Sequence, residues 1–241
     1  MPKQFIANAP LADLFVVFAR TGKENYGTKG ISVFLVEADL PGVIGSKGHK
    51  TGQAGAWTAE VFFDNVRVGM AALIGGQEGA GFGAAMKSLI RGRVHIAALC
   101  VGMAERIVEE SVAYAAAGRQ GGRPIGEFQL VRAMLAEIQT GVFAGRVMVV
   151  DAAEKYDSGE DRKLRPSATA SYCSEMVSRA ADLAVQIHGD MGYMRGTAVE
   201  RCFRDAGLFR VFEGTSEIQK MITGRALLKD AQQKGAKWPW P

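Results

Sequence analysis

The sequence holds few of the residues that build disulfide frameworks or metal sites. Its 241 residues include three cysteines and three histidines. Cys100, Cys173 and Cys202 lie far apart in apolar, helix-like sequence, and an odd number of thiols cannot all pair within one chain. No CxxC or histidine-rich spacing matches a zinc site. We therefore predict reduced thiols, a cytoplasmic protein and no metal centre.

Targeting segments and strongly charged stretches are also missing. The first residues, MPKQFIANAP, lack the apolar core of a signal peptide. No run approaches the roughly 18–20 apolar residues that cross a bilayer, because Arg, Glu or His interrupts every candidate. The net charge of +4 is spread along the sequence, without a basic block interleaved with aromatics. We expect neither a membrane nor a nucleic acid as partner.

Short β-branched and aromatic runs characterise residues 1–75. The segments 14–20 (LFVVFAR), 31–37 (ISVFLVE) and 60–68 (EVFFDNVRV) predict strands, and the sequences between them are rich in turn residues. No helical pattern separates these strands, so a parallel crossover is excluded. The pattern predicts an antiparallel sheet.

The period of the apolar residues changes to that of helices from Gly83 onward. The expected buried stripes are Ala97, Val101, Ala104, Val108 and Val112; Phe128, Val131, Leu135, Ile138, Val142 and Val149; and Cys173, Met176, Ala180, Leu183 and Ile187. A shorter helix should follow Gly214. We predict an α+β fold: a partial antiparallel β-domain (1–75), an antiparallel four-helix bundle (76–230) and a flexible tail (231–241).

A glycine-rich stretch, GGQEGAGFGA at 75–84, contains the spacing Gly79-x-Gly81-x-x-Ala84. This superficially resembles a dinucleotide fingerprint, which also needs an acidic residue about 20 positions on, after the next strand. Here the sequence at that distance is still helical. We interpret the stretch as a flexible link between sheet and bundle, and a nucleotide-binding module is the weakest of three functional hypotheses.

Two further stretches carry candidate chemistry. In VFEGTSEIQK (211–220), Glu213 precedes a predicted helix whose N-terminus favours the charged carboxylate, while apolar neighbours favour the protonated form. Glu213 is therefore a helix cap or a general base. In QIHGDMGY (186–193), Gly189 and Gly192 either cap a helix or expose backbone to a ligand. His49, His95 and His188 are isolated, and we interpret them as structural.

Taken in chain order, several segments resemble the acyl-CoA dehydrogenase family. The resemblance runs from Phe5 to Asp230 and covers the second half of the family's middle β-domain and its C-terminal helical domain. The segments that carry it are FIANAPLADLFVVFAR, FFDNVRV, GAGF, RPIGEFQ, AVQIHGDMGY, VERCFRDA and FEGTSEIQ. One such segment would be weak support, but the ordered set is specific.

The resemblance implies an enzyme that uses FAD to oxidise the α,β bond of an acyl-CoA thioester. Glu213 would be the catalytic base that takes the α-proton, while the β-hydrogen leaves as hydride to flavin N5. Hydrogen bonds to the thioester carbonyl must strengthen as enolate charge develops, because such a proton is only weakly acidic. Arg93 and Gly214 match positions that contact the substrate.

The resemblance also implies where FAD and protein partners bind. The matching cofactor-binding positions are Phe5, Ala7, Arg119, Gln186, Ile187, His188, Gly189, Thr215 and Glu217. The segment 186–189 matches one that reaches the FAD of a neighbouring subunit, as does Arg119, so a homodimer or homotetramer is expected. Electrons would pass to an electron-transfer flavoprotein.

Some positions differ from the family's pattern. Ala7 stands where a Thr or Ser hydroxyl bonds the flavin, Phe5 replaces a usual Trp, and Asp190 places a negative charge near the expected FAD. The family's N-terminal helical domain and the first half of its β-domain have no counterpart in the sequence. The alternative hypothesis is therefore a non-catalytic subunit or oligomerisation module of the same family.

Overall fold

The computed structural model describes residues 2–235 and divides into two compact units, Met1–Ser88 and Leu89–Pro241. The boundary falls inside helix α1 (Gly81–Ala117), which begins in the first unit. The predicted α+β class with a helical bundle is confirmed. The domain limit at residue 75 remains a prediction.

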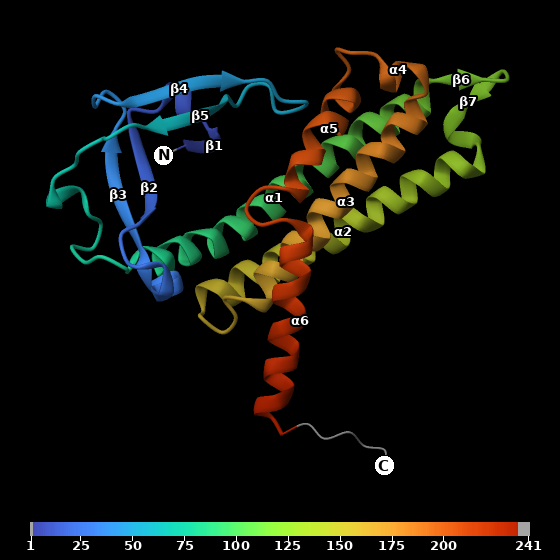
Figure 1. Ribbon diagram of the computed structural model, residues 1–241. Coiled ribbons are helices and arrows are strands. Elements are labelled where there is room, and N and C mark those ends of the chain that lie inside the picture. Colours follow the sequence, from blue (N-terminus) through green and yellow to red (C-terminus); the bar gives the residue numbers. More distant parts are fainter. Residues whose placement is uncertain (1, 236–241) are drawn as a thin grey trace. The chain divides into compact units, whose positions relative to one another are not determined.

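The first unit holds two small antiparallel sheets. The strands are β1 (Pro2–Ala7), β2 (Leu14–Arg20), β3 (Ile31–Glu37), β4 (Val43–Gly48) and β5 (Thr58–Phe63). One sheet has the order β1-β5-β4, and the other pairs β2 with β3 (Figure 1). In the second sheet Leu14 lies opposite Glu37. Short 3₁₀ helices span Ala9–Leu11, Glu24–Gly30 and Met70–Ala72. The core includes Ala59 and Val61, with Phe15 and Phe63 edge to face at 6.0 Å.

The predicted strands 14–20 and 31–37 match β2 and β3 residue for residue. The strand predicted at 60–68 was wrong at both ends, because β5 covers only Thr58–Phe63. The chain turns immediately after β5: the N–H of Asp64 donates to the carbonyl of Gly42 at 2.9 Å, and Asn65 has a left-handed φ of 50°. Asn tolerates this conformation, which ends a strand.

The interpretation of 75–84 as a flexible link was wrong where the chain enters α1. The N–H of Gly79 donates to the hydroxyl of Ser32 at 2.8 Å. A Cβ on Gly81 would lie 2.7 Å from the carbonyl carbon of Ser32. Gly81 is needed because the chain packs directly on the backbone of β3 at this point.

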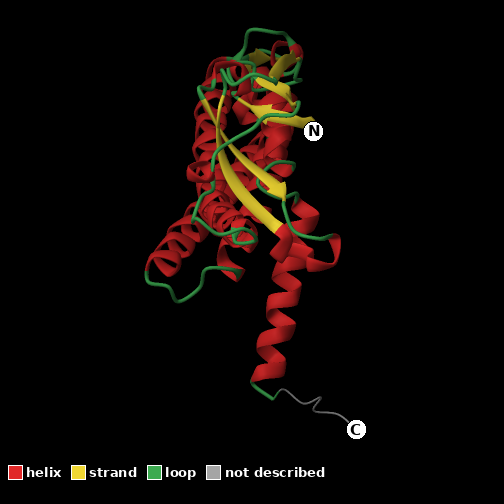
Figure 2. Ribbon diagram, turned by 60° about the vertical axis from the view of Figure 1, so that its left-hand side comes forward, coloured by secondary structure: helices red, strands yellow, loops and turns green. Residues whose placement is uncertain are grey.

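Six helices and one small hairpin belong to the rest of the described chain. They are α1, the hairpin β6 (Arg119–Gln120) and β7 (Arg123–Pro124), α2 (Gln129–Asp157), α3 (Leu164–His188), α4 (Asp190–Tyr193), α5 (Ala198–Ala206) and α6 (Ser216–Gln233). Further 3₁₀ turns span Ile125–Glu127 and Gly207–Arg210. The helices α2 and α3 pack along each other, while α6 packs on α3 and its far end projects from the bundle (Figures 1 and 2).

One continuous apolar core joins the long helices. It includes Ile107 from α1, Ile138 and Val142 from α2, and Cys173 and Val177 from α3. The predicted stripes are buried at most of their positions. Six of the 16 positions are only partly buried, and Val112 is 48% exposed because the buried face of α1 passes instead through Ile107 and Ser111.

Some predicted features of the C-terminal region need correction. Helix α5 was not predicted, because its nine residues are too few for a convincing periodic stripe. Helix α6 continues to Gln233, so residues 231–233, which we predicted as tail, are helical. The last part of the predicted tail, 236–241, lies outside the described residues.

The three cysteines are free and buried. Burial raises the pKa of the Cys173 thiol to about 12 and also raises the pKa values of Cys100 and Cys202. Thiols with such raised pKa values remain protonated and unreactive.

Helix α2 exposes an unusually apolar surface. By length and composition it is the one helix in the described part of the chain that could cross a membrane, which we did not predict because charged residues interrupt its apolar sequence. Leu130 is 79% and Phe143 67% exposed, and Val147 and Val150 are about half exposed. Large exposed apolar surfaces of this kind mark interaction sites.

Ile107→Ala tests the core. Ile107 is 1% exposed, so the substitution should lower the free energy of unfolding by about 2–5 kcal/mol through lost burial and a cavity. Leu130→Ala, at an exposed position, should change it by no more than about 0.5 kcal/mol. Urea unfolding followed by circular dichroism compares the two. Equal losses would contradict the assigned core.

Candidate functional site

Glu213 lies in a strained turn just before α6. Its φ is 56° and that of Gly214 is 95°, so two successive residues are left-handed. Gln219 donates its side-chain amide to the carbonyls of Glu213 at 3.1 Å and Gly214 at 3.0 Å. Thr215 caps α6 by accepting a hydrogen bond from the N–H of Ile218 at 3.4 Å. The turn is thus fixed from the helix that follows it.

The Glu213 carboxylate rests against α1 at Gly92. A Cβ built on Gly92 would lie 3.0 Å from the Glu213 Cδ and would collide with Oε2. Gly92 therefore leaves the space that the carboxylate occupies. Gly92 was not among the predicted site residues, although it immediately precedes the predicted substrate residue Arg93.

Arg93 is a buried cation beside this carboxylate. It is 5% exposed, and its Nη1 donates to the hydroxyl of Ser167 on α3 at 3.1 Å. Among the described residues its Nε has no hydrogen-bond partner. Burial lowers the pKa of Arg93, and the negative charge of Glu213 opposes that shift. The charge of Glu213 therefore helps to stabilise the buried guanidinium of Arg93.

Thr215 and Glu217 complete the start of α6. The carboxylate of Glu217 accepts hydrogen bonds from the backbone N–H of Glu217 itself and from the Thr215 hydroxyl. These hydrogen bonds lower the pKa of Glu217, so its carboxylate is charged. A carboxylate in the first turn of a helix also complements the helix dipole. Both predicted FAD-binding side chains therefore have local capping roles, and Glu217 remains exposed.

The segment 186–189 forms a second group at the C-terminal end of α3. The Nδ1 of His188 lies 2.8 Å from the carbonyl of Ala184, and its ring stacks on Tyr114 at 4.3 Å. Ile187 and His188 are buried, whereas Gln186 and Gly189 are exposed. With a φ of 58°, Gly189 ends the helix, as the capping interpretation predicted.

These two groups lie far apart within one chain. Ser167, which binds Arg93, and His188 are 21 positions apart on α3. At 1.5 Å per residue this is about 31 Å along the helix axis. The structure therefore brings Glu213, Gly214, Thr215 and Arg93 together, but not with residues 186–189.

The remaining predicted cofactor residues are on exposed backbone elsewhere. Arg119 is exposed on the β6–β7 hairpin, where its Nη2 donates to the carbonyl of Gly122 at 3.1 Å. Phe5 is 80% exposed and has a φ of 58°, at a register shift in the pairing of β1 with β5. Ala7 is exposed and pairs with Thr58. Phe5 and Ala7 belong to the first unit.

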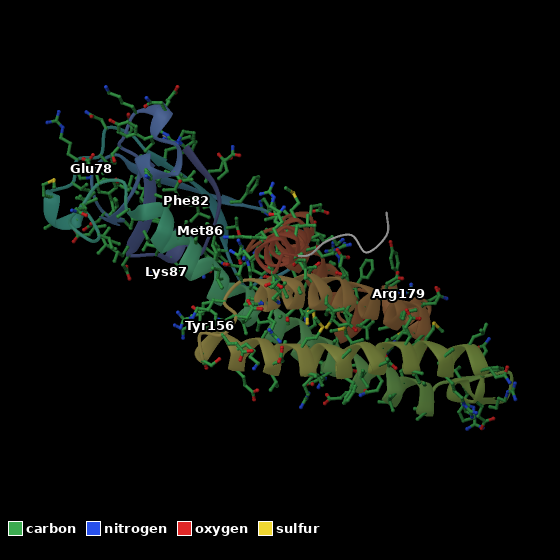
Figure 3. The ribbon with its side chains drawn as sticks, turned by 90° about the horizontal axis from the view of Figure 1, so that it is seen from below. Glu78, Phe82, Met86, Lys87, Tyr156 and Arg179 are labelled. Atoms are coloured by element: carbon green, nitrogen blue, oxygen red, sulfur yellow. The ribbon has the colours of Figure 1, made fainter. Side chains whose placement is uncertain are left out.

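A separate cavity of about 950 Å³ lies among α2, α3 and α6. Its lining includes Ile138, Met176 and Leu183, and at its rim the Nε of Arg179 pairs with Glu137 at 2.9 Å. Figure 3 labels Arg179 on α3. The cavity and the Glu213 site involve different residues.

The fold and site define an α+β protein in which a helical bundle holds a carboxylate against a glycine and beside a buried guanidinium. The chain belongs to the acyl-CoA dehydrogenase family. The model of the family's C-terminal domain matches residues 79–228, and that of its middle domain matches residues 2–66.

Relatives from several bacteria agree with this assignment. An acyl-CoA dehydrogenase of Bacillus subtilis is 41% identical over 94% of this chain and 59% of that protein. The caffeyl-CoA reductase-Etf complex subunit CarC of Acetobacterium woodii is 36% identical over 94% of this chain and 60% of that protein. The structure of butyryl-CoA dehydrogenase from Megasphaera elsdenii has a TM-score of 0.90 at 36% identity, and the match covers 95% of this chain and 59% of that chain. The chain thus spans about 60% of their length.

Ser167→Ala tests the support of Arg93. Removing the hydroxyl that binds the buried guanidinium should lower the free energy of unfolding by about 1–3 kcal/mol. Ser174→Ala is the control, because Ser174 is also buried on α3 but donates only to the carbonyl of Ser171. Both variants gain similar helix propensity, so urea unfolding isolates the Arg93 contact. A loss no larger at Ser167 than at Ser174 would refute it.

Proposed function

We propose that this chain carries the catalytic base of an FAD-dependent acyl-CoA dehydrogenase, and that Glu213 takes the α-proton of an acyl-CoA thioester. The observation that carries this proposal is the placement of the Glu213 carboxylate against Gly92 and beside buried Arg93. A strained turn that holds a carboxylate at one place is typical of functional sites.

The surroundings of Glu213 suit proton abstraction. The buried guanidinium of Arg93 interacts with the negative charge of Glu213, and an ionised carboxylate is the form able to accept a proton. Since Gly92 has no side chain, the carboxylate can lie directly against the backbone of α1. Bound FAD would supply the hydride acceptor for the β-hydrogen.

The chain's residues fit FAD as two separate half-sites. Thr215 and Glu217 lie near the base, whereas residues 186–189 lie about 31 Å away along α3. One cofactor bound near Glu213 would therefore need the 186–189 segment of a second copy. The exposed Phe5 ring and the Arg119 guanidinium are available for contact with the flavin and a phosphate.

We further propose that the protein is a homodimer or homotetramer. The apolar face of α2 and the adjoining cavity among α2, α3 and α6 form a surface that contact with a second copy would bury. An electron-transfer flavoprotein is the proposed electron acceptor. The name of the Acetobacterium woodii relative, which places that protein in an Etf complex, supports this partner.

Glu213→Gln should abolish dehydrogenation and leave FAD bound. It keeps the shape of the side chain but removes the proton acceptor, so turnover should fall by at least about 10²-fold. The test is to purify the chain, record its visible spectrum, and add FAD with an acyl-CoA under anaerobic conditions. Bleaching of the flavin reports the reaction.

The matched control is Glu109→Gln. Glu109 is an exposed glutamate on α1, and within the described part of the chain its one ion pair is with Arg106 at 3.6 Å. This variant should bleach flavin like the parent. If the Glu213→Gln variant still bleached the flavin, a residue other than Glu213 would be the catalytic base. A parent chain that retains no flavin would favour the non-catalytic oligomerisation module.

Gly92→Ala should impair proton abstraction without harming the fold. The new methyl group would occupy the position of the Glu213 carboxylate, which can swing aside because it is the end of a flexible side chain. We expect flavin bleaching to slow by on the order of 10²-fold, since a misplacement of about 1 Å can cost that much.

Gly102→Ala is the control for that substitution. Gly102 is also inside α1, and no described atom beyond the neighbouring helix backbone lies within 4 Å of its Cβ position. This variant should bleach at the parent rate and gain up to about 1 kcal/mol in stability from helix propensity. Equal rates for both alanine variants would refute the role of Gly92.

A further inference from the structure

We infer that Gln219 is a positioning residue, whose side-chain amide holds Glu213 in the left-handed conformation that directs its carboxylate to Gly92 and Arg93. The catalytic part of this inference rests on the proposed function. The conformational part rests on the geometry of the turn alone.

Gln219 is placed to hold both residues of the turn at once. It lies one turn into α6, is 2% exposed, and uses its Nε2 to donate to two successive carbonyls, at 3.1 Å for Glu213 and 3.0 Å for Gly214. A primary amide carries two hydrogens on one nitrogen, so it can serve both acceptors without bringing a buried charge.

The turn requires such support, because Glu213 has a side chain. A left-handed φ is unfavourable for a residue with a Cβ and persists only where its surroundings impose it. Gly214 contributes in a complementary way: a Cβ there would lie 2.6 Å from the Gln219 Nε2. Gly214 and Gln219 are therefore a matched pair.

The oxygen atom of the Gln219 amide shows why this residue positions the turn and does not simply stabilise the fold. The Gln219 Oε1 is buried without a hydrogen-bond partner among the described residues, which is unfavourable for folding. A methionine of similar size would remove this unpaired acceptor along with the two donated bonds. The role of Gln219 is thus to position Glu213, and its net contribution to the stability of the fold is small.

Gln219→Met in the full chain tests the inference. We expect the crystal structure of the variant to show Glu213 released from its left-handed φ and its carboxylate displaced from Gly92. In the FAD-loaded protein, kcat should fall by on the order of 10²-fold while KM for acyl-CoA changes little. The isotope effect with α-deuterated acyl-CoA should grow, because proton transfer becomes slower.

Gln219→Glu gives a pH signature that a merely structural role lacks. The ionised carboxylate would repel both carbonyls, whereas the protonated form would donate to one of them. Its kcat relative to the parent should therefore recover as the pH falls. Thr223→Val is the control on the same helix, because the Thr223 hydroxyl is buried without a partner in the described chain and is not bonded to the turn. It should behave like the parent.

The outcomes are distinguishable. An unchanged turn in the Gln219→Met structure, or an unchanged kcat with the carboxylate displaced, would overturn the inference. If the parent has no turnover, the proposed function fails, and the variant structure still decides whether Gln219 holds the turn. If Gln219→Met does not fold, crystal structures of Gln219→Glu are compared at a pH where its new carboxyl group is protonated and at a pH where it is ionised. This comparison then decides whether the side chain at position 219 holds the turn.

Discussion

The buried charge of Arg93 is the constraint on which the site depends. A guanidinium removed from water is unfavourable unless other groups compensate for its lost hydration. Here the compensation comes from the Ser167 hydroxyl on α3 and the charge of Glu213 in front of α6. Three helices must therefore meet at one point. The cation on α1 links the packing of the bundle to the position of a carboxylate that is distant in sequence.

The sequence predicted those parts of the fold whose patterns are local and regular. β2 and β3 are uninterrupted β-branched and aromatic runs between turns, and the long helices have apolar stripes. The strand β4 contains two glycines and β1 contains the irregularity at Phe5, so neither shows a clean alternation. The bundle was thus more predictable than the sheets.

The site was predictable only where a motif exists. Glu213 was a candidate from its own segment, and the family resemblance added Arg93, although no periodicity connects the two residues. Gly92 matters because it lacks a side chain, and Gln219 because it binds backbone carbonyls. Ser167 is one small residue among several at the start of α3. Such roles depend on three-dimensional contacts that no local pattern records.

The core of the bundle encloses all three thiols of the chain. Cys100, Cys173 and Cys202 all face the same core, on α1, α3 and α5. Because the closed bundle keeps them protonated and inaccessible, an oxidant or electrophile can reach them only when those helices separate. Chemical damage at these sulfurs would therefore record opening of the bundle, and an intact bundle protects the only thiols in the chain.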